Sequence, residues 1–245
     1  MSILDLFKRK KVNVQPQEPY WKVEQARINK ILRAIESLDD DSNGKSVIQE
    51  PQKSSYYNLQ DIRTMQMGEF MICPYDAMWF FEAPDASVIP TFANTPEIRR
   101  YLPGLKLETK ESCKKTLEAC LVKTEAGLGL TYIIRQQNIP IGMIILSSPK
   151  YNEKVINLRV WTIDFFISKK FEHRGIMYNS LQKVLNQLKG MDVNYVYATI
   201  DQSNSSCINL IGNGFFTEID NRYFCNRESS GEKPLVYRIN LATIL

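Results

Sequence analysis

One stretch of the chain joins a strand pattern to a helix pattern with only a short charged turn between them. Residues Asn157–Ser168 are rich in the Val, Trp, Ile and Phe that favour strands, and Gly175–Lys189 places apolar residues mostly on one side of a helix. A second strand pattern, Asn194–Ile200, follows. This order predicts a β-α-β unit within a sheet of mixed pairing. The first strand is long for an average strand, so we expect it to contain a β-bulge.

The remaining patterns place antiparallel pairs beside this unit. Further strands are expected at Leu130–Arg135, Ile141–Leu146, Phe215–Ile219 and Leu235–Ile239, the first two joined by the tight connection QQNIP. Helices are expected at Asp85–Asn94, Pro96–Tyr101 with Thr95 as N-cap, Ser112–Lys123 and Ser205–Ile211, and a loop at Ser147–Lys154. The predicted fold class is α/β (α+β), with a mixed, mostly antiparallel central sheet of about six or seven strands flanked by helices.

The first part of the chain differs in character from the rest. Within residues 21–38, five apolar side chains recur on one helical face, which predicts a helix. Residues 39–58 are polar, contain Gly and Pro and show no period, which is typical of a linker. We therefore expect an N-terminal extension over residues 1–66, followed by one folded domain over residues 67–245.

The charge distribution argues against several classes of protein. The formal net charge is +4, and residues 1–12 carry four basic side chains against Asp5, so +3 lies there and the remainder is nearly neutral. Nucleic-acid binding needs a basic face spread over a domain, and we expect none. No run approaches the ~18 apolar residues of a membrane span. The basic segment is expected to be a solvated tail, with contact to an anionic membrane surface as the alternative.

Cysteine and histidine usage points to a reducing compartment. The five cysteines are odd in number, lack C-x-x-C spacing and share the chain with one histidine. Neither a disulfide framework nor a metal site is expected, and the cysteines are interpreted as reduced thiols. The N-terminus puts apolar residues before its charges, unlike a secretory signal, so a cytoplasmic location is predicted.

The turn before the Gly175–Lys189 helix has the chemistry of an anion site. A helix that starts directly after a strand presents unpaired backbone N–H groups and the positive end of its dipole at the sheet edge. Gly175 lets the backbone approach an anion without a Cβ, and Arg174 can supply a positive partner. The alternative is a glycine that only eases an ordinary strand-to-helix turn.

The order of motifs around this turn resembles the GNAT N-acetyltransferase superfamily, closest to its ribosomal-protein N-terminal acetyltransferase branch. The resemblance spans roughly residues 85–239 and rests on FFISKKFEHRGIMYNSLQKV, YVYATIDQSNSSCINLIGNGF, PEIRRYLPG and NIPIGMIIL. It implies that acetyl-CoA is the co-substrate and that a splayed parallel pair of strands receives its pantetheine arm. A bulge in the first of these strands would open the pair.

The resemblance also implies which residues contact the co-substrate. In the family pattern Gln/Arg-x-x-Gly-x-Gly/Ala, Glu172 stands at the first position, Gly175 at the glycine and Met177 at the last. Glu172 departs from the pattern, and we expect its side chain to point to solvent. Gly214-Phe215 match the Gly-Phe that closes the motif. The implied cofactor-binding residues are Phe166, Ile167, Ser168, His173, Arg174, Gly175, Ile176, Met177, Tyr178 and Asn204.

Acetyl transfer to an amine also needs a base and a proton for the leaving sulfur. Asp164 is the candidate base because it interrupts an apolar strand, where burial would raise the pKa of its carboxyl; the alternative is an aspartate that faces solvent. Related sequences often carry a glutamate where Thr162 stands, on the same strand face. The family tyrosine that protonates the thiolate would fall near Ile211. The other candidate phenols are Tyr178, Tyr195, Tyr197 and Tyr223.

The sequence thus predicts an enzyme, an acetyl-CoA-dependent N-acetyltransferase. The expected acceptor is a primary amine on a peptide or protein N-terminus or on a small molecule, with direct attack in a ternary complex. The alternative is a non-catalytic acyl-CoA-binding or protein-interaction module on the same fold. The sequence leaves a homodimer open.

Overall fold

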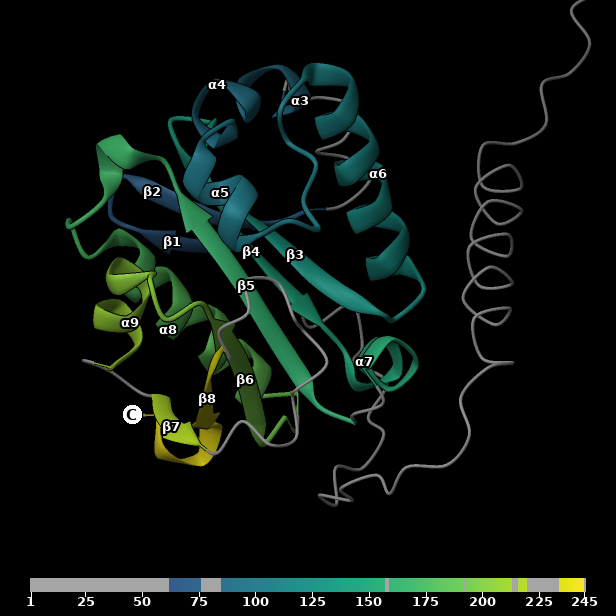
Figure 1. The fold of residues 1–245 in the computed structure, drawn as a ribbon, viewed down its shortest axis with the longest axis vertical. Coiled ribbons are helices and arrows are strands. Elements are labelled where there is room, and N and C mark those ends of the chain that lie inside the picture. Colours follow the sequence, from purple (N-terminus) through teal and green to yellow (C-terminus); the bar gives the residue numbers. More distant parts are fainter. Residues whose placement is uncertain are drawn as a thin grey trace, which may run out of the picture. The chain divides into compact units, whose positions relative to one another are not determined.

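The protein is built on one mixed sheet whose strands follow the order β1-β2-β3-β4-β5-β6-β8-β7 (Figure 1). The computed structural model describes residues 62–75, 85–156, 159–191, 193–212, 216–219 and 234–244. The predicted N-terminal helix, linker and basic tail lie outside these residues, as do Gly214-Phe215 and Tyr223.

All neighbouring strands of this sheet are antiparallel except β5 and β6, which are parallel. This arrangement confirms the predicted mixed, mostly antiparallel fold class. The described part of the sheet has eight strands, more than the predicted six or seven. The difference is due to the short strands β1 and β2, which the sequence analysis did not predict. The strands are β1 Met65–Met67, β2 Phe70–Pro74, β3 Gly129–Gln136, β4 Ile139–Ser147, β5 Trp161–Ile167, β6 Tyr195–Ile200, β7 Phe216–Ile219 and β8 Leu235–Asn240.

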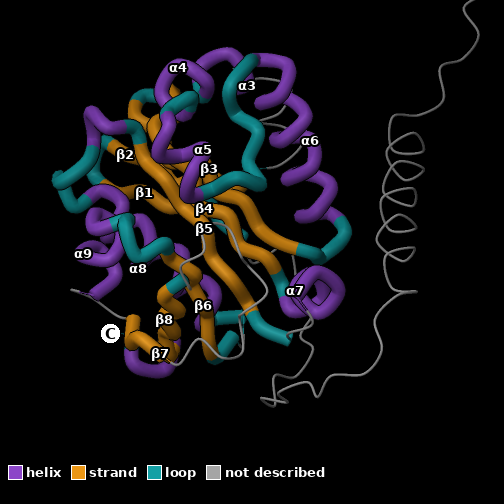
Figure 2. Tube along the Cα trace, viewed as in Figure 1, coloured by secondary structure: helices purple, strands orange, loops and turns teal. Residues whose placement is uncertain are grey.

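Helices cover both faces of the sheet (Figure 2). They are α3 Asp85–Val88, α4 Pro90–Ala93, α5 Pro96–Tyr101, α6 Lys110–Glu125, α7 Pro149–Ile156, α8 Ile176–Lys189 and α9 Ser205–Gly212, with 3₁₀ turns at η4 Lys169–Phe171 and η6 Leu241–Thr243. As predicted, Thr95 caps α5 by accepting a hydrogen bond from the Ile98 N–H. No helix in the described ranges has the length and hydropathy needed to cross a membrane.

Two cores form because side chains alternate between the faces of each strand. On β5, Trp161 and Ile163 pack with α8 and α9 in one core, while Phe166 packs with α3, α4 and α6 in the other. Asp164 shares its face of the strand with Phe166 by the same alternation. The two faces of β5 therefore pack against different helices.

Three local predictions were wrong. Asp85–Asn94 is not one helix, because Pro90 lacks the N–H that a continuing helix would need and instead begins α4. The expected loop at Ser147–Lys154 contains α7, which Asn152 anchors by donating from Nδ2 to the Ser147 and Val160 carbonyls at 3.1 and 2.7 Å.

The predicted bulge in the strand before the turn is also absent. The described strand β5 is seven residues long, not the twelve-residue run Asn157–Ser168, and its register with β4 runs from Ser147↔Thr162 to Gly142↔Ile167 without a shift. Gly142 permits this close pairing, because a Cβ there would lie 2.7 Å from the Phe166 carbonyl oxygen. The shorter strand needs no extra residue to fit the sheet.

The parallel pair nevertheless opens. Trp161 pairs with Val196 and Thr162 with Tyr197, and the ladder then stops although both strands continue. From Ile163 onward β5 is paired only with β4, which leaves an interior strand edge facing β6. The sheet is therefore split at the carboxyl ends of its two parallel strands.

Candidate active site

A cavity of about 680 Å³ occupies the split and reaches both faces of the sheet. Its walls come from α4 and α5 on one face, from η4, α8 and α9 on the other, and from the diverging ends of β5 and β6. A cavity of this volume is in the range of small-molecule sites. Of the eleven positions predicted for catalysis or cofactor binding, nine line it, and Ser168 and Arg174 do not.

The turn before α8 presents backbone N–H groups to this cavity. Gly175 is the N-cap residue with φ 71° and ψ 0°, a left-handed conformation that favours glycine, and His173 has φ 58°. The first helical hydrogen bond runs from the Asn179 N–H to the Gly175 carbonyl at 3.0 Å. The amides at the start of α8, including those of Ile176 and Met177, therefore precede the helical ladder and can bind an anion.

The charged side chains of the turn differ in their distance from the cavity. The Arg174 guanidinium lies 5.5 Å from the ring centroid of Phe171, a cation–π arrangement, instead of facing the cavity. Glu172 is one of the residues that line the cavity; its carboxylate lies 4.0 Å from His173 Nε2, and its side chain is 40% exposed. His173 is largely exposed at the cavity rim. Positive charge at this rim therefore comes from His173 when protonated and from Lys169.

The backbone of β5 alternates between its partner strand and the split. The Ser168 N–H donates to the Ile141 carbonyl on β4 at 2.7 Å, so this predicted contact residue is already engaged. Because hydrogen-bonding direction alternates along a strand, the backbone of Phe166 also points to β4, and the groups of Phe165 and Ile167 point toward the split. Among the predicted strand positions, Ile167 thus offers its amide to the cavity, and Phe165 is a residue that sequence reasoning missed.

Asp164 lines the cavity and is half-buried, so both its role as base and the alternative of a solvent-facing aspartate stay predictions. Thr162, which belongs to the last residue pair of the β5–β6 ladder, exchanges hydrogen bonds with the Asn152 side chain. Cys207 of α9 lines the same cavity. Burial, and to a smaller extent the negative charge of Asp164, raises the pKa of the Cys207 thiol to about 12.

Asn204 also lines the cavity, where it caps α9. Its side-chain oxygen accepts a hydrogen bond from the Cys207 N–H at 3.1 Å. A contact from Asn204 to a bound co-substrate would consequently use the Nδ2 amide.

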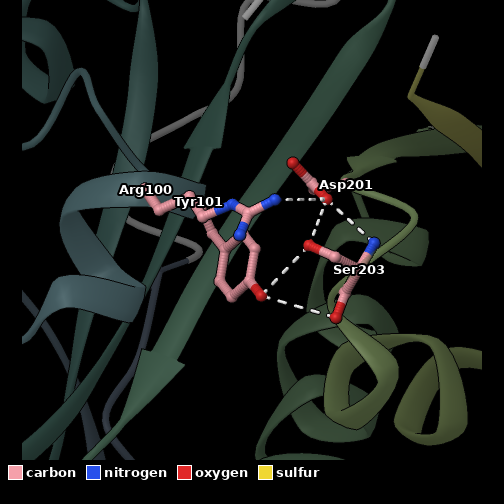
Figure 3. A network of polar contacts seen from close by, with 4 residues as sticks. All are labelled: Arg100, Tyr101, Asp201 and Ser203. Carbon is pink, nitrogen blue, oxygen red and sulfur yellow. Dashed lines mark hydrogen bonds and ion pairs between the residues drawn. The ribbon is translucent and has the colours of Figure 1, made fainter. Parts of the chain in front are cut away.

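A polar bridge crosses the cavity between α5 and the connection from β6 to α9 (Figure 3). The Tyr101 hydroxyl lies 3.3 Å from Ser203 Oγ and 3.4 Å from the Ser203 carbonyl oxygen. Beside it, Arg100 approaches Asp201 at 3.9 Å. Hydrogen bonds from the Ser203 hydroxyl and N–H lower the pKa of the Asp201 carboxyl. We call these four residues the α5 bridge.

The candidate tyrosines differ in whether they line the cavity. Tyr178 lines the cavity, whereas Tyr197 is buried in a separate cluster and Tyr195 packs against Arg238. Ile211, at the position of the expected tyrosine, is buried and carries no acid group. Tyr101 was missed, because nothing in the local sequence indicates that α5 approaches a loop 102 residues away.

A sequence model of the family described as acetyltransferase (GNAT) domain matches residues 80–213. This range includes α4, α5, β5, η4, the turn, α8, β6 and α9, that is, every described element that lines the cavity. No curated protein matches the sequence.

Solved structures with the same fold include several acetyltransferases. A ribosomal-protein-S5-alanine acetyltransferase from Vibrio fischeri has a TM-score of 0.57 at 12% identity, covering 75% of this chain and 100% of that one. An enzyme from Salmonella typhimurium that modifies the N-terminal serine of a 50S ribosomal subunit protein has a TM-score of 0.54 at 15% identity, covering 71% and 94%. The microcin C7 self-immunity acetyltransferase, in complex with acetyl-CoA and AMP, has a TM-score of 0.56 at 12% identity, covering 71% and 93%.

Proposed function

Because the chain belongs to the acetyltransferase (GNAT) family, we propose that it transfers an acetyl group from acetyl-CoA to a primary amine. One observation carries the proposal: the unpaired edge of β5 and the N-terminal amides of α8 line the same cavity. The amides can hold the diphosphate of the co-substrate, and the open strand edge can hold its amide-containing arm as an added strand. The solved acetyltransferase with bound acetyl-CoA shares this fold.

The amides of the turn and those of β5 are proposed to bind different parts of acetyl-CoA. N–H groups of Ile176 and Met177, aided by the helix dipole, favour the diphosphate. The Phe165 and Ile167 backbone groups facing the split can pair with the pantetheine arm and polarise the thioester carbonyl. The Asn204 amide supplies a further donor.

Asp164 is the proposed base. A neutral amine attacks the thioester carbon, the C–N bond forms and the C–S bond breaks, and Asp164 takes the proton lost from the nitrogen, directly or through water. The departing sulfur takes a proton from solvent or from Tyr101 or Tyr178, the two described phenols at the cavity.

The raised pKa of the Cys207 thiol favours direct transfer of the acetyl group to the amine over a route through an acetylated cysteine. With a pKa of about 12, only about 10⁻⁵ of this thiol is ionised at pH 7. The other described cysteines, Cys73, Cys113 and Cys120, are buried in the core. No cysteine among the described residues therefore favours an acyl-enzyme, and we propose that the amine attacks the thioester itself.

Two measurements test this function. Acetyl-CoA should raise the melting temperature, and an amine and peptide panel should release free CoA thiol and yield acetylated products by mass spectrometry. Replacing Asp164→Asn should lower kcat by about 10²–10⁴-fold without loss of acetyl-CoA binding. An unchanged rate in this variant would remove Asp164 from the role of base.

A second function fits two observations. Ile211 is buried at the place of the expected phenol, and Glu172, which carries a negative charge, is a lining residue beside the anion-binding turn. Both suit an acyl-CoA-binding module without turnover. Thermal stabilisation by acetyl-CoA with no thiol release against the full panel would favour the module, and absence of stabilisation would reject both functions.

The acceptor, a homodimer and a cytoplasmic location stay predictions. The Salmonella typhimurium acetyltransferase with this fold modifies the N-terminal serine of a ribosomal protein, and a protein or peptide N-terminus is accordingly our first acceptor class.

A further inference from the structure

Apolar side chains line the cavity on the face of the sheet that carries α4 and α5. Phe92 of α4, Ile98 of α5 and Leu102 directly after α5 line it and are only partly buried. Phe166 of β5 also lines it, with its ring centroid 6.3 Å from that of Phe92. We call these four residues the apolar chamber. Apolar side chains that line a cavity without filling it gain free energy when an apolar group covers them.

The chamber lies on the side of the sheet from which an acceptor would reach Asp164. The face of β5 that carries Phe166 also carries Asp164, whereas the turn and α8, which would hold the diphosphate, belong to the opposite face. The co-substrate and the acceptor therefore approach the split from opposite faces. An amine placed at Asp164 brings its nearest substituents into the chamber.

The negative charges and the walls of the cavity further restrict which substituents the acceptor amine can carry. Asp164 and Asp201 both line the cavity at the diverging strand ends, so they attract an ammonium group and repel a carboxylate. The α5 bridge, through the contacts of Tyr101 with Ser203, closes the cavity between α5 and the end of β6. A polar side chain in the chamber would lose part of its hydration against these apolar walls, which favours apolar side chains.

We propose that the acceptor is an amine borne next to an apolar side chain, as at a peptide N-terminus that begins with leucine, isoleucine or methionine. The inference rests on the proposed function and assigns the apolar chamber as the site for that side chain. Peptides that begin with an acidic residue are poor acceptors, because their carboxylate meets both apolar walls and two aspartates.

The test uses the full-length protein, acetyl-CoA and four peptides that are identical after the first residue, which is leucine, alanine, glycine or aspartate. The expected kcat/KM for the leucine peptide exceeds that for the glycine peptide at least about tenfold, the discrimination typical of an apolar pocket, and the aspartate peptide is the poorest. Equal rates, or a preference for glycine or aspartate, would overturn the inference and leave the acetyltransferase function in place. No thiol release with any peptide or small amine would overturn both.

Variants locate the selection in the chamber. Leu102→Asn should lower the leucine-to-glycine ratio of kcat/KM about tenfold, and Leu102→Met should retain most of it. The control Ile139→Asn changes an apolar residue that is 56% exposed on β4, away from the cavity, and should leave the ratio unchanged. A leucine preference that persists in Leu102→Asn and in Ile98→Asn would show that another surface selects the acceptor.

Discussion

Replacing Gly175→Ala tests whether the turn before α8 is held for its backbone conformation. Gly175 has φ 71° and ψ 0°, where a residue with a Cβ costs about 1–2 kcal/mol. The added Cβ would meet only Asn179 Nδ2, at 3.8 Å, so steric overlap contributes nothing. The lower entropy of the unfolded alanine chain returns about 0.4–1 kcal/mol. The expected net loss is about 0–1.6 kcal/mol, or a fall in melting temperature of up to about 6 °C.

Acetyl-CoA affinity decides whether that conformation serves anion binding. If alanine relaxes the turn and one amide loses its charge-assisted hydrogen bond, the expected loss of about 1.5–3 kcal/mol weakens binding at least about tenfold in calorimetry. Gly175→Asn is the matched control, because asparagine tolerates the left-handed region and should retain both stability and affinity better than alanine. Equal losses in the two variants would refute the backbone argument. Full affinity in a destabilised Gly175→Ala protein would refute the anion site.

Two further predictions concern buried and partly buried carboxylates. Asp85 and Arg135 form a bidentate ion pair at 2.9 and 2.6 Å, and their side chains are only 1% and 0% exposed. Asp85→Asn should therefore lower the free energy of unfolding, measured by urea titration, by about 3–5 kcal/mol. Replacing both residues by apolar ones should recover much of this loss. The pKa of Asp201 is lowered on folding, so its stabilisation is present above pH ~4 and is lost as pH falls through the folded-state pKa. Asp201→Asn should therefore flatten the decline of stability below about pH 4, and an identical acid limb would contradict this assignment.

Short-range patterns predicted the elements around the site with small boundary errors. The helix after the turn, both strands of the split pair and the cap at Thr95 follow from residues within a few positions of one another. Prediction failed where the deciding contact lies elsewhere. Helix α7 is held by bonds from Asn152 to β4 and to the residue before β5, and β2 is held by pairing with β3, some 60 residues later.

The site shows the same division between local and long-range information. The turn at Gly175 and the cavity position of Asp164 were accessible from the sequence, because they depend on a strand followed directly by a helix. The direction of the Ser168 amide depends on the register between β4 and β5, which the expected bulge would have shifted. Tyr101 reaches the site only because α5 lies across the split.

The open edge of β5 is the physical centre of the site. Unpaired backbone groups inside a sheet are costly, and natural sheets avoid or cover such edges. In β5 the unshifted register with β4 secures one side of the strand, so the other side can part from β6 after Thr162 without loss of the sheet. The open edge lines the cavity between the helices of the two faces, where the pantetheine arm of the co-substrate can complete the ladder. One edge of β5 thereby stabilises the sheet, and the opposite edge is available for binding. Substitutions that weaken β4–β5 pairing, such as Gly142→Val, should lower the free energy of unfolding more than they change acceptor binding.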